Sequence, residues 1–221
     1  MTELTESAAR QKIIDACRAM NAAGINQGTS GNVSIRHEGR MLISPSATPY
    51  DAMTPDMIAS IDLAGEMTGA WDGPRKPSTE WRFHWLLLKH REDVGSVVHA
   101  HPTHCTALAI LREPIPACHY MIAAFGGMDV RCAGYATFGS PELADLAVEA
   151  LEDRTACLLA NHGMVAVGGD VDQALWRAIE LETIARQYHT ARLIGDPVLL
   201  SKAEIDETFG MFAGYGRQAD A

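Results

Sequence analysis

Residues 94–111 read VGSVVHAHPTHCTALAIL, a β-rich run that ends in a His-x-His pair and is followed by an apolar segment. Val97 and Val98 favour a strand over 94–101, and a helix is predicted over 103–111. Side chains two residues apart on a strand point to the same face, so His99 and His101 can meet one ion. The stretch therefore predicts a strand that carries two candidate metal ligands at its end.

Strands and helices alternate on both sides of this stretch. A hairpin is predicted from two closely spaced β-rich runs, so the sheet is not purely parallel, and an α/β fold with a layered sheet under helices is expected. Residues 45–77 are predicted to hold loops, one short helix and one strand. No repeat or linker divides the sequence, so residues 1–221 are expected to form a single domain. The remaining helices are predicted at 8–23, 80–90, from Ser140, at 172–194 and from Ser201, and the strands at 33–36, 41–44, 156–160 and 164–167.

The composition excludes several classes of protein. With 221 residues and 47% apolar side chains, the chain can bury a real core and is not intrinsically disordered. A net charge of −10 argues against a nucleic-acid partner, whose phosphates need cations. The five cysteines show no CxxC spacing, the N-terminus has no secretory signal, and no apolar run could span a bilayer. A soluble, cytoplasmic protein with no membrane partner is expected.

A third histidine and a glutamate extend the candidate metal site. His162 follows the apolar run Leu158–Ala160 and precedes Gly163, a glycine that lets the backbone approach closely. Three imidazoles with an open fourth position are typical of catalytic zinc. Glu80 lies at the start of a helix and is a candidate ligand or general base, although a first-turn carboxylate also stabilises a helix by itself. On spacing alone, satisfied core histidines remain the alternative interpretation.

Two segments are candidate anion sites. Gly28-Thr29-Ser30-Gly31-Asn32 could surround a phosphate with backbone amides, although a glycine-rich turn before a strand is often only a turn. Ser78 and Thr79 precede Glu80, where hydroxyls and free first-turn amides favour anions; the alternative is that they only cap the helix. The nucleotide-binding motifs GxGxxG and Gly-Lys-Ser/Thr are missing from the glycine-rich segment, so nucleotide binding is not predicted.

Taken together, these segments resemble the class II aldolase/adducin family, and within it the aldolases that act on L-fuculose 1-phosphate. The likeness extends from about Ala8 to Tyr215 and implies a three-layer αβα sandwich with a central mixed or antiparallel sheet. The stretches that carry it are GTSGNVSIR at 28–36, ISPSATPYD at 43–51, PSTEWRFH at 77–84, VVHAHPTHCTALAIL at 97–111, IPACHYMIAAFGG at 115–127, YATFGS at 135–140, LLANHG at 158–163 and GYG at 214–216.

The resemblance also implies a site and an activity. The activity is cleavage of a ketose 1-phosphate to dihydroxyacetone phosphate and an aldehyde such as lactaldehyde, with one Zn²⁺ per subunit as cofactor. The usual assembly is a homotetramer with its sites between subunits. By position, the implied zinc ligands are Glu80, His99, His101 and His162; the catalytic residues are Glu80 and Tyr120; the phosphate-binding residues are Thr29, Asn32, Ser46, Ala47, Ser78 and Thr79; and the aldehyde pocket contains Phe138 and Tyr215.

The sequence departs from the family pattern in the phosphate loop. Ser46 and Ala47 stand where the family has threonine and glycine, and alanine disfavours a positive φ. The hydroxyl and the backbone amide survive this change, but the loop geometry is not predicted by the sequence.

Three alternatives remain open. A phosphopentulose 4-epimerase shares the fold and the histidines, but carries aspartate where Glu80 stands. An aldolase of 5-deoxyribulose or 5-methylthioribulose 1-phosphate could use apolar residues such as Met121, Ile122, Phe125 and Phe138 to hold its substrate tail. A non-enzymatic module like the adducin heads is disfavoured, because this chain retains all of the ligand types.

Overall fold

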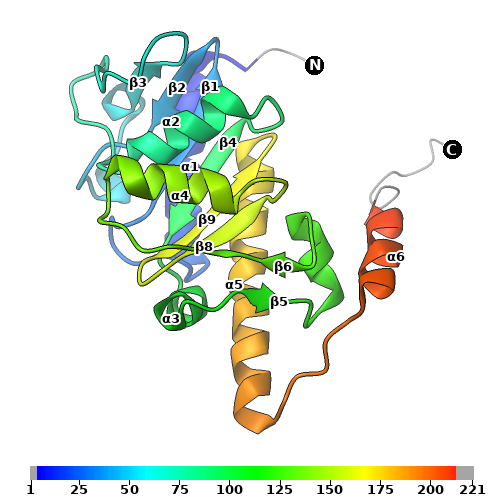
Figure 1. The fold of residues 1–221 in the computed structure, drawn as a ribbon. Coiled ribbons are helices and arrows are strands. Elements are labelled where there is room, and N and C mark those ends of the chain that lie inside the picture. The colour runs from blue at the N-terminus through cyan, green and yellow to red at the C-terminus, as the bar shows by residue number, and fades with distance from the viewer. Residues whose placement is uncertain (1–3, 213–221) are drawn as a thin grey trace, which may run out of the picture.

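Seven strands form the central sheet of the computed structural model, which describes residues 4–212. Their order is β3-β2-β1-β4-β9-β8-β7, with every neighbouring pair antiparallel except β7 and β8 (Figure 1). The sheet is therefore mixed, as predicted. The strands are β1 (Asn32–His37), β2 (Arg40–Ile43), β3 (Ala59–Asp62), β4 (Ser96–Ala100), β7 (Cys132–Ala133), β8 (Ala156–Leu159) and β9 (Gly163–Gly168).

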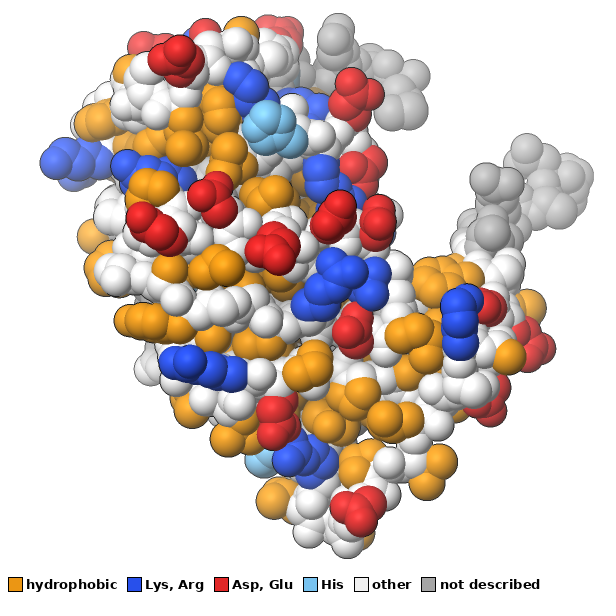
Figure 2. All heavy atoms as spheres, viewed as in Figure 1, with side chains coloured by type: hydrophobic (Ala, Val, Ile, Leu, Met, Phe, Trp, Pro, Cys, Tyr) orange, Lys and Arg blue, Asp and Glu red, His pale blue; other side chains and the backbone are white. Residues whose placement is uncertain are grey.

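Helices cover both faces of this sheet. One face packs against α1, α3 and α5, and the other against α2 and α4, so the predicted three-layer αβα sandwich is confirmed (Figure 1). The helices are α1 (Glu6–Ala22), α2 (Trp81–His90), α3 (Thr103–Leu111), α4 (Pro141–Ala150) and α5 (Val171–Ile194). Figure 2 shows acidic side chains spread over the α4 side of the molecule, where Glu142, Asp145 and Glu149 are exposed.

The alternation of side chains along β4 decides which layer receives each residue. Val98 and Ala100 belong to the core beneath α1, α3 and α5, whereas Val97 belongs to the core beneath α2 and α4. His99 has the same parity as Val97, and its ring packs edge-on against Phe83 of α2 at a centroid distance of 5.5 Å. The strand therefore directs His99 toward the layer that also carries Glu80.

A smaller unit extends beyond the edge of the sheet. It contains the two-stranded sheet of β5 (Ile115–Pro116) and β6 (Asp129–Val130), the 3₁₀ helix η3 (Tyr120–Phe125) and α6 (Lys202–Phe212). Figure 1 shows α6 standing apart from the main layers, next to η3. Ile205 of α6 is buried against Ala117 and Ala123, which attaches the helix to this unit.

Most predicted elements are confirmed to within about two residues, and the differences concern short segments. The expected short helix within 45–77 is replaced by two single 3₁₀ turns, η1 (Tyr50–Ala52) and η2 (Pro55–Met57), ahead of β3. Pro49 and Pro55 begin these turns, and an extended residue follows each, so neither turn continues into an α-helix. None of the described helices combines the length and the apolar character that a bilayer span requires.

Candidate functional site

The four predicted metal ligands come from three elements whose ends meet. Glu80 occupies the N-cap of α2, His99 lies in β4, His101 follows β4, and His162 lies in the turn between β8 and β9. Because β4 pairs with β9 and β9 pairs with β8, the two histidine-bearing strand ends are adjacent. One ligand atom from each of the four residues lies within 4.8 Å of all the others.

The short distances in this cluster define its chemistry. Glu80 Oε2 is 3.1 Å from His99 Nε2, and Glu80 Oε1 is 3.2 Å from His162 Nε2. The two Nε2 atoms of His99 and His101 face each other at 2.9 Å. His99 Nδ1 lies 2.8 Å from the carbonyl oxygen of Met164, which can only accept, so Nδ1 carries a proton and donates it. The Nε2 atom of a neutral His99 ring then presents a lone pair to the cluster.

This arrangement fits a divalent metal ion. Nitrogen and carboxylate ligand atoms converge here, and Glu80 Oε1 is buried and makes no well-oriented hydrogen bond among the described residues, although His162 Nε2 lies 3.2 Å away. Such a buried acceptor costs free energy unless a cation or donor satisfies it. A donor set of three imidazoles and one carboxylate, with space beside it, is typical of catalytic rather than purely structural metal sites.

The Glu80 carboxylate favours positive charge at this point. Burial favours the neutral form of Glu80, but His99 and His162 outweigh it and lower the pKa of the carboxyl well below its ordinary value. Burial also disfavours a charged His99, and the Glu80 carboxylate overrides this effect and raises the pKa of the ring. Burial, together with His99 and His162, lowers the pKa of His101 to about 3. His101 is therefore neutral and able to ligate at physiological pH.

A cavity of about 440 Å³ opens over the cluster. All of the residues predicted to bind phosphate line it, together with Glu80, His101, His162 and Phe138. The N-terminus of α2 supplies one wall, where Ser78 Oγ accepts a hydrogen bond from the backbone N–H of Glu80 at 3.3 Å. The structure thus brings the predicted ligands and the predicted anion loops to one hollow.

The structure defines the geometry of the Ser46–Ala47 loop, which the sequence did not predict. Ala47 adopts a φ of 50°, in the left-handed region that glycine enters without cost. The loop is held by the Ser46 backbone N–H, which donates to the carbonyl of Lys76 at 2.9 Å, and by a short bridge between Pro45 and Pro77. These contacts hold an alanine in a conformation that it disfavours, and both Ser46 and Ala47 line the cavity.

Glycine is required at one point of the site. A Cβ on Gly163 would lie 2.5 Å from the carbonyl oxygen of Ala100 and 2.6 Å from Cδ2 of His101. Both distances are shorter than atoms tolerate, so this position must lack a side chain for His101 and His162 to approach each other. The predicted close approach of the backbone at Gly163 is confirmed.

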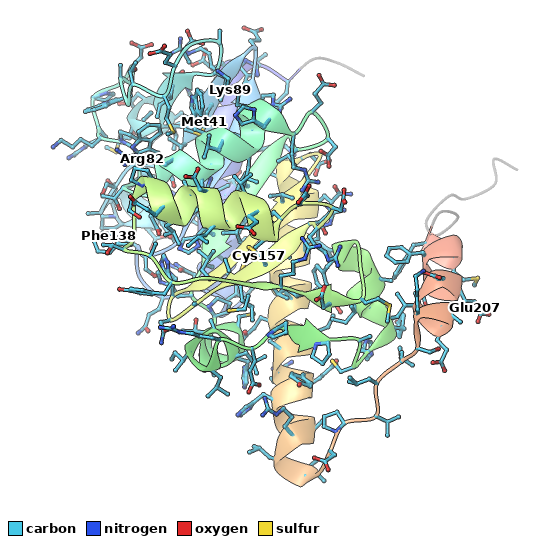
Figure 3. The ribbon with its side chains drawn as sticks, in the orientation of Figure 1. Met41, Arg82, Lys89, Phe138, Cys157 and Glu207 are labelled. Atoms are coloured by element: carbon cyan, nitrogen blue, oxygen red, sulfur yellow. The ribbon has the colours of Figure 1, made fainter. Side chains whose placement is uncertain are left out.

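The outer rim of the cavity includes residues that were not predicted from the sequence. Tyr135, Ala136 and Asn161 line it beside Phe138. Arg82 of α2 donates from Nη1 to the carbonyl of Gly139 at 2.8 Å, which ties the Phe138 loop to the helix that begins at the site (Figure 3). The YATFGS stretch already contained Tyr135, but no spacing rule distinguished its ring from a core aromatic.

Tyr120 lies outside this cavity within a single chain. It begins η3, is 53% exposed, and lines a second hollow of about 1120 Å³ between η3, α5 and α6. Its ring is 4.6 Å from that of His119, centroid to centroid. Figure 3 shows Phe138 of the first cavity and Glu207 of the second on opposite sides of the molecule. Tyr215, the other predicted pocket residue, lies outside the described residues.

The chain is similar to known proteins over nearly its whole length. The family model described as Class II Aldolase and Adducin N-terminal domain matches residues 11–189. A 5-methylthioribulose-1-phosphate/5-deoxyribulose-1-phosphate aldolase of Rhodospirillum rubrum is 46% identical over 212 residues, which cover 96% of this chain and 94% of that protein. An L-fuculose phosphate aldolase of Escherichia coli strain K12 is 46% identical over 207 residues, which cover 93% of this chain and 94% of that protein.

Solved structures agree with these sequence relatives. A structure of an L-fuculose 1-phosphate aldolase superposes with a TM-score of 0.89 at 36% identity, over 96% of this chain and all of that chain. The structure of YgbL from Escherichia coli, titled a putative aldolase/epimerase/decarboxylase, has a TM-score of 0.79 at 26% identity, over 92% of this chain and 99% of that chain.

Proposed function

Because the chain belongs to the class II aldolase and adducin N-terminal domain family, whose aldolases act on small phosphorylated sugars, we propose a zinc-dependent ketose-1-phosphate aldolase. The products are dihydroxyacetone phosphate and an aldehyde, with an L-fuculose 1-phosphate-like sugar as the substrate and lactaldehyde as the aldehyde. The observation that carries the proposal is the convergence of Glu80 and three imidazoles in the wall of a cavity that the predicted phosphate loops also line.

In this proposal, one set of residues binds the phosphate and another holds the metal. The hydroxyls of Thr29, Ser46, Ser78 and Thr79, together with backbone amides at the start of α2, bind the phosphate. When bound, the metal supplies Lewis-acid chemistry that stabilises negative charge on the ketone and hydroxyl oxygens beside the breaking bond. The three histidines suit this chemistry, because neutral imidazole ligands leave more positive charge on a metal than thiolates do.

Two proton transfers complete the cleavage. Glu80 takes up a proton from solvent when the substrate binds, and Tyr120, as the phenolate, takes the proton from the hydroxyl that becomes the aldehyde oxygen. As the carbon–carbon bond breaks, its electron pair passes to the dihydroxyacetone phosphate side, and Glu80 gives its proton to that carbon. The Tyr120 phenol then releases its proton to solvent, so both residues regain their starting states. Since Tyr120 lies away from the cavity of its own chain, we place it in the cavity of a neighbouring subunit within a homotetramer. A cytoplasmic location belongs to the same proposal, supported by five cysteines that are all free.

A second candidate substrate is favoured by the rim of the cavity. Phe138 and Tyr135 are exposed aromatic side chains at the cavity, and they could hold a methyl or methylthio tail. The Rhodospirillum relative is named for substrates of this kind. One methylene in an apolar pocket changes kcat/KM by only ~10–200-fold, so the two substrate classes can overlap in one enzyme.

The test is a substrate panel with metal analysis. Purified protein is assayed on L-fuculose 1-phosphate, 5-deoxyribulose 1-phosphate and 5-methylthioribulose 1-phosphate, and dihydroxyacetone phosphate is detected directly. We expect dihydroxyacetone phosphate from at least one of them, one zinc per chain, and loss of turnover after chelation. His101→Ala should lose both zinc and turnover and keep its far-UV circular dichroism, whereas His90→Ala, at the exposed end of α2, should resemble the wild type. Epimerised pentulose phosphate without dihydroxyacetone phosphate would overturn the proposal.

A further inference from the structure

A chain of buried polar side chains extends from β1 to the candidate active site. Ser34 Oγ lies 2.8 Å from His84 Nδ1, and His84 Nε2 lies 2.5 Å from Asn32 Oδ1. Asn32 Nδ2 in turn donates to Glu80 Oε2 at 3.1 Å. Ser34 and His84 are completely buried, and Asn32 and Glu80 are nearly so. His84 is therefore not a solvated surface histidine. It is buried, and it hydrogen-bonds to Asn32, which lines the cavity.

The hydrogen bonds that join these four side chains have only one consistent direction of donation. The Glu80 carboxylate accepts, so Asn32 must present its NH₂ group to it and its carbonyl oxygen to His84. That carbonyl only accepts, so the proton of a neutral His84 ring resides on Nε2 and leaves a lone pair on Nδ1. The Ser34 hydroxyl then donates to Nδ1. Each of the three hydrogen bonds then has one defined donor, and no other tautomer of a neutral His84 satisfies all three.

The direction matters because an asparagine amide can also lie the other way round. A half-turn of the Asn32 carboxamide would place Oδ1 against the Glu80 carboxylate, two acceptors facing each other in a buried position. It would also exchange the amide and carbonyl groups of a side chain that lines the cavity. The backbone of Asn32 is held where it begins β1 opposite His99, but this pairing does not orient the side-chain carboxamide. Among the described residues, only His84 has a side chain that bonds to Asn32 Oδ1.

We propose that His84 is a positioning residue that acts through Asn32: its Nε2–H fixes the Asn32 carboxamide so that one N–H holds Glu80 and the other faces the substrate. The orientation of Asn32 by His84 is inferred from the hydrogen bonds alone, whereas the expected effect on turnover rests on the proposed aldolase function. Because outer partners of a metal site typically contribute 10–100-fold, a loss of roughly that size is expected when the Nε2–H donor is removed.

Two variants distinguish the loss of the His84 Nε2–H donor from the loss of side-chain volume. His84→Met retains a long side chain without a donor, and we expect it to lower kcat/KM on the ketose 1-phosphate roughly 10–100-fold with zinc content unchanged. His84→Gln places a carboxamide nitrogen near the former Nε2 and should restore most of that loss. His90→Met makes the same change at an exposed histidine of α2 and should have no effect.

A double-mutant cycle tests whether His84 acts through Asn32. In an Asn32→Ala background, His84→Met should cause no further loss, since the group that it orients is gone. Losses that multiply across the two sites would show that His84 serves only the core, and would overturn the proposal. If His84→Met does not fold, Ser34→Ala weakens the same chain and should lower kcat/KM about 2–10-fold.

A measurement without turnover keeps this inference separate from the aldolase assignment. Long-range ¹H–¹⁵N correlation spectra of histidine-labelled, zinc-loaded protein distinguish the two neutral tautomers, and we expect the Nε2–H form for His84. A crystal structure of His84→Met should show the Asn32 amide rotated or moved from Glu80. An Nδ1–H tautomer, or an unmoved Asn32, would overturn the proposal even in an active enzyme. The expected tautomer in a protein without aldolase activity would contradict the proposed function alone.

Discussion

At the scale of single residues, burial lowers the pKa of two histidines, His84 and His101. Burial is the main cause that lowers the pKa of His84 to about 3, and it does the same for His101. For His84, the neighbouring His99 lowers the pKa further and Glu80 opposes this. The ordinary histidine value is 6.5, so both groups bind protons more readily in the unfolded chain than in the folded one.

This difference predicts an acid-sensitive metal-free protein. A group whose pKa is depressed by folding stabilises the fold above its unfolded pKa, and that stability is lost as the pH falls from 6.5 toward 3. We expect the free energy of unfolding of chelator-treated protein to fall over this range. His84→Gln should reduce the slope by up to ~1.4 kcal/mol per pH unit, the value for one proton. Urea titrations at several pH values measure it, and equal slopes for variant and wild type would contradict the prediction.

Some site residues could be predicted from the sequence and others could not, for physical reasons. His99, His101 and His162 carry a residue type with a specific chemistry at strand ends, and the structure brings them together with Glu80. His84 has the same residue type in the middle of a helix, where spacing does not reveal which way an amide on a distant strand points. Its role depends on three hydrogen bonds between separate elements, which only the fold defines.

At the scale of secondary structure, capping signals made the helices predictable. Ser140 caps α4 by accepting from the backbone N–H of Leu143 at 3.1 Å, as the Ser-Pro-Glu signal predicts. The strands β5, β6 and β7 contain two residues each and were not predicted, because two residues show no periodicity. Their pairing depends on neighbours that are distant in the sequence.

Helix α3, which follows His101, is capped from another element. Pro102 occupies its N-cap without a side-chain bond. The Glu182 carboxylate of α5 accepts instead from the backbone N–H groups of His104 and Cys105, the latter at 2.9 Å, and from His104 Nδ1 at 2.7 Å. A carboxylate at this end of a helix satisfies orphan N–H groups and complements the helix dipole. No local sequence signal reveals this cap, since its partner lies in α5.

We therefore predict that Glu182→Ala destabilises the protein. Its free energy of unfolding should fall by about 2 kcal/mol, because several first-turn donors lose a charged acceptor in a partly buried position. Gln187→Ala makes a similar truncation at an exposed position of the same helix and should change stability little. Urea unfolding of zinc-free protein compares the two variants. Equal midpoints would show that α3 does not need this cap.

At the scale of the whole molecule, the predicted catalytic residues occupy two separate surfaces. Glu80, His101 and Phe138 line one cavity, whereas Tyr120 and Glu207 line the hollow between η3, α5 and α6. Figure 3 shows Phe138 and Glu207 on opposite sides of the molecule. Trp176 and Met211 around that hollow are large apolar side chains left exposed. Exposed apolar surface of this kind favours contact with another subunit. The proposed tetramer accounts for both observations, because a neighbour can bring Tyr120 to the cavity.

Mixed oligomers test this arrangement. His101→Ala and Tyr120→Phe should each be inactive or slow alone, the first for lack of metal and the second for lack of the proton acceptor. If each site combines one subunit's cavity with its neighbour's Tyr120, co-expressed chains with different affinity tags should regain activity. In a randomly mixed ring, about a quarter of the sites would contain both intact halves. A mixture of His101→Ala with Glu80→Gln should regain nothing, since both changes damage the same cavity. Mixed oligomers that form without regaining activity would show that Tyr120 is not shared between subunits.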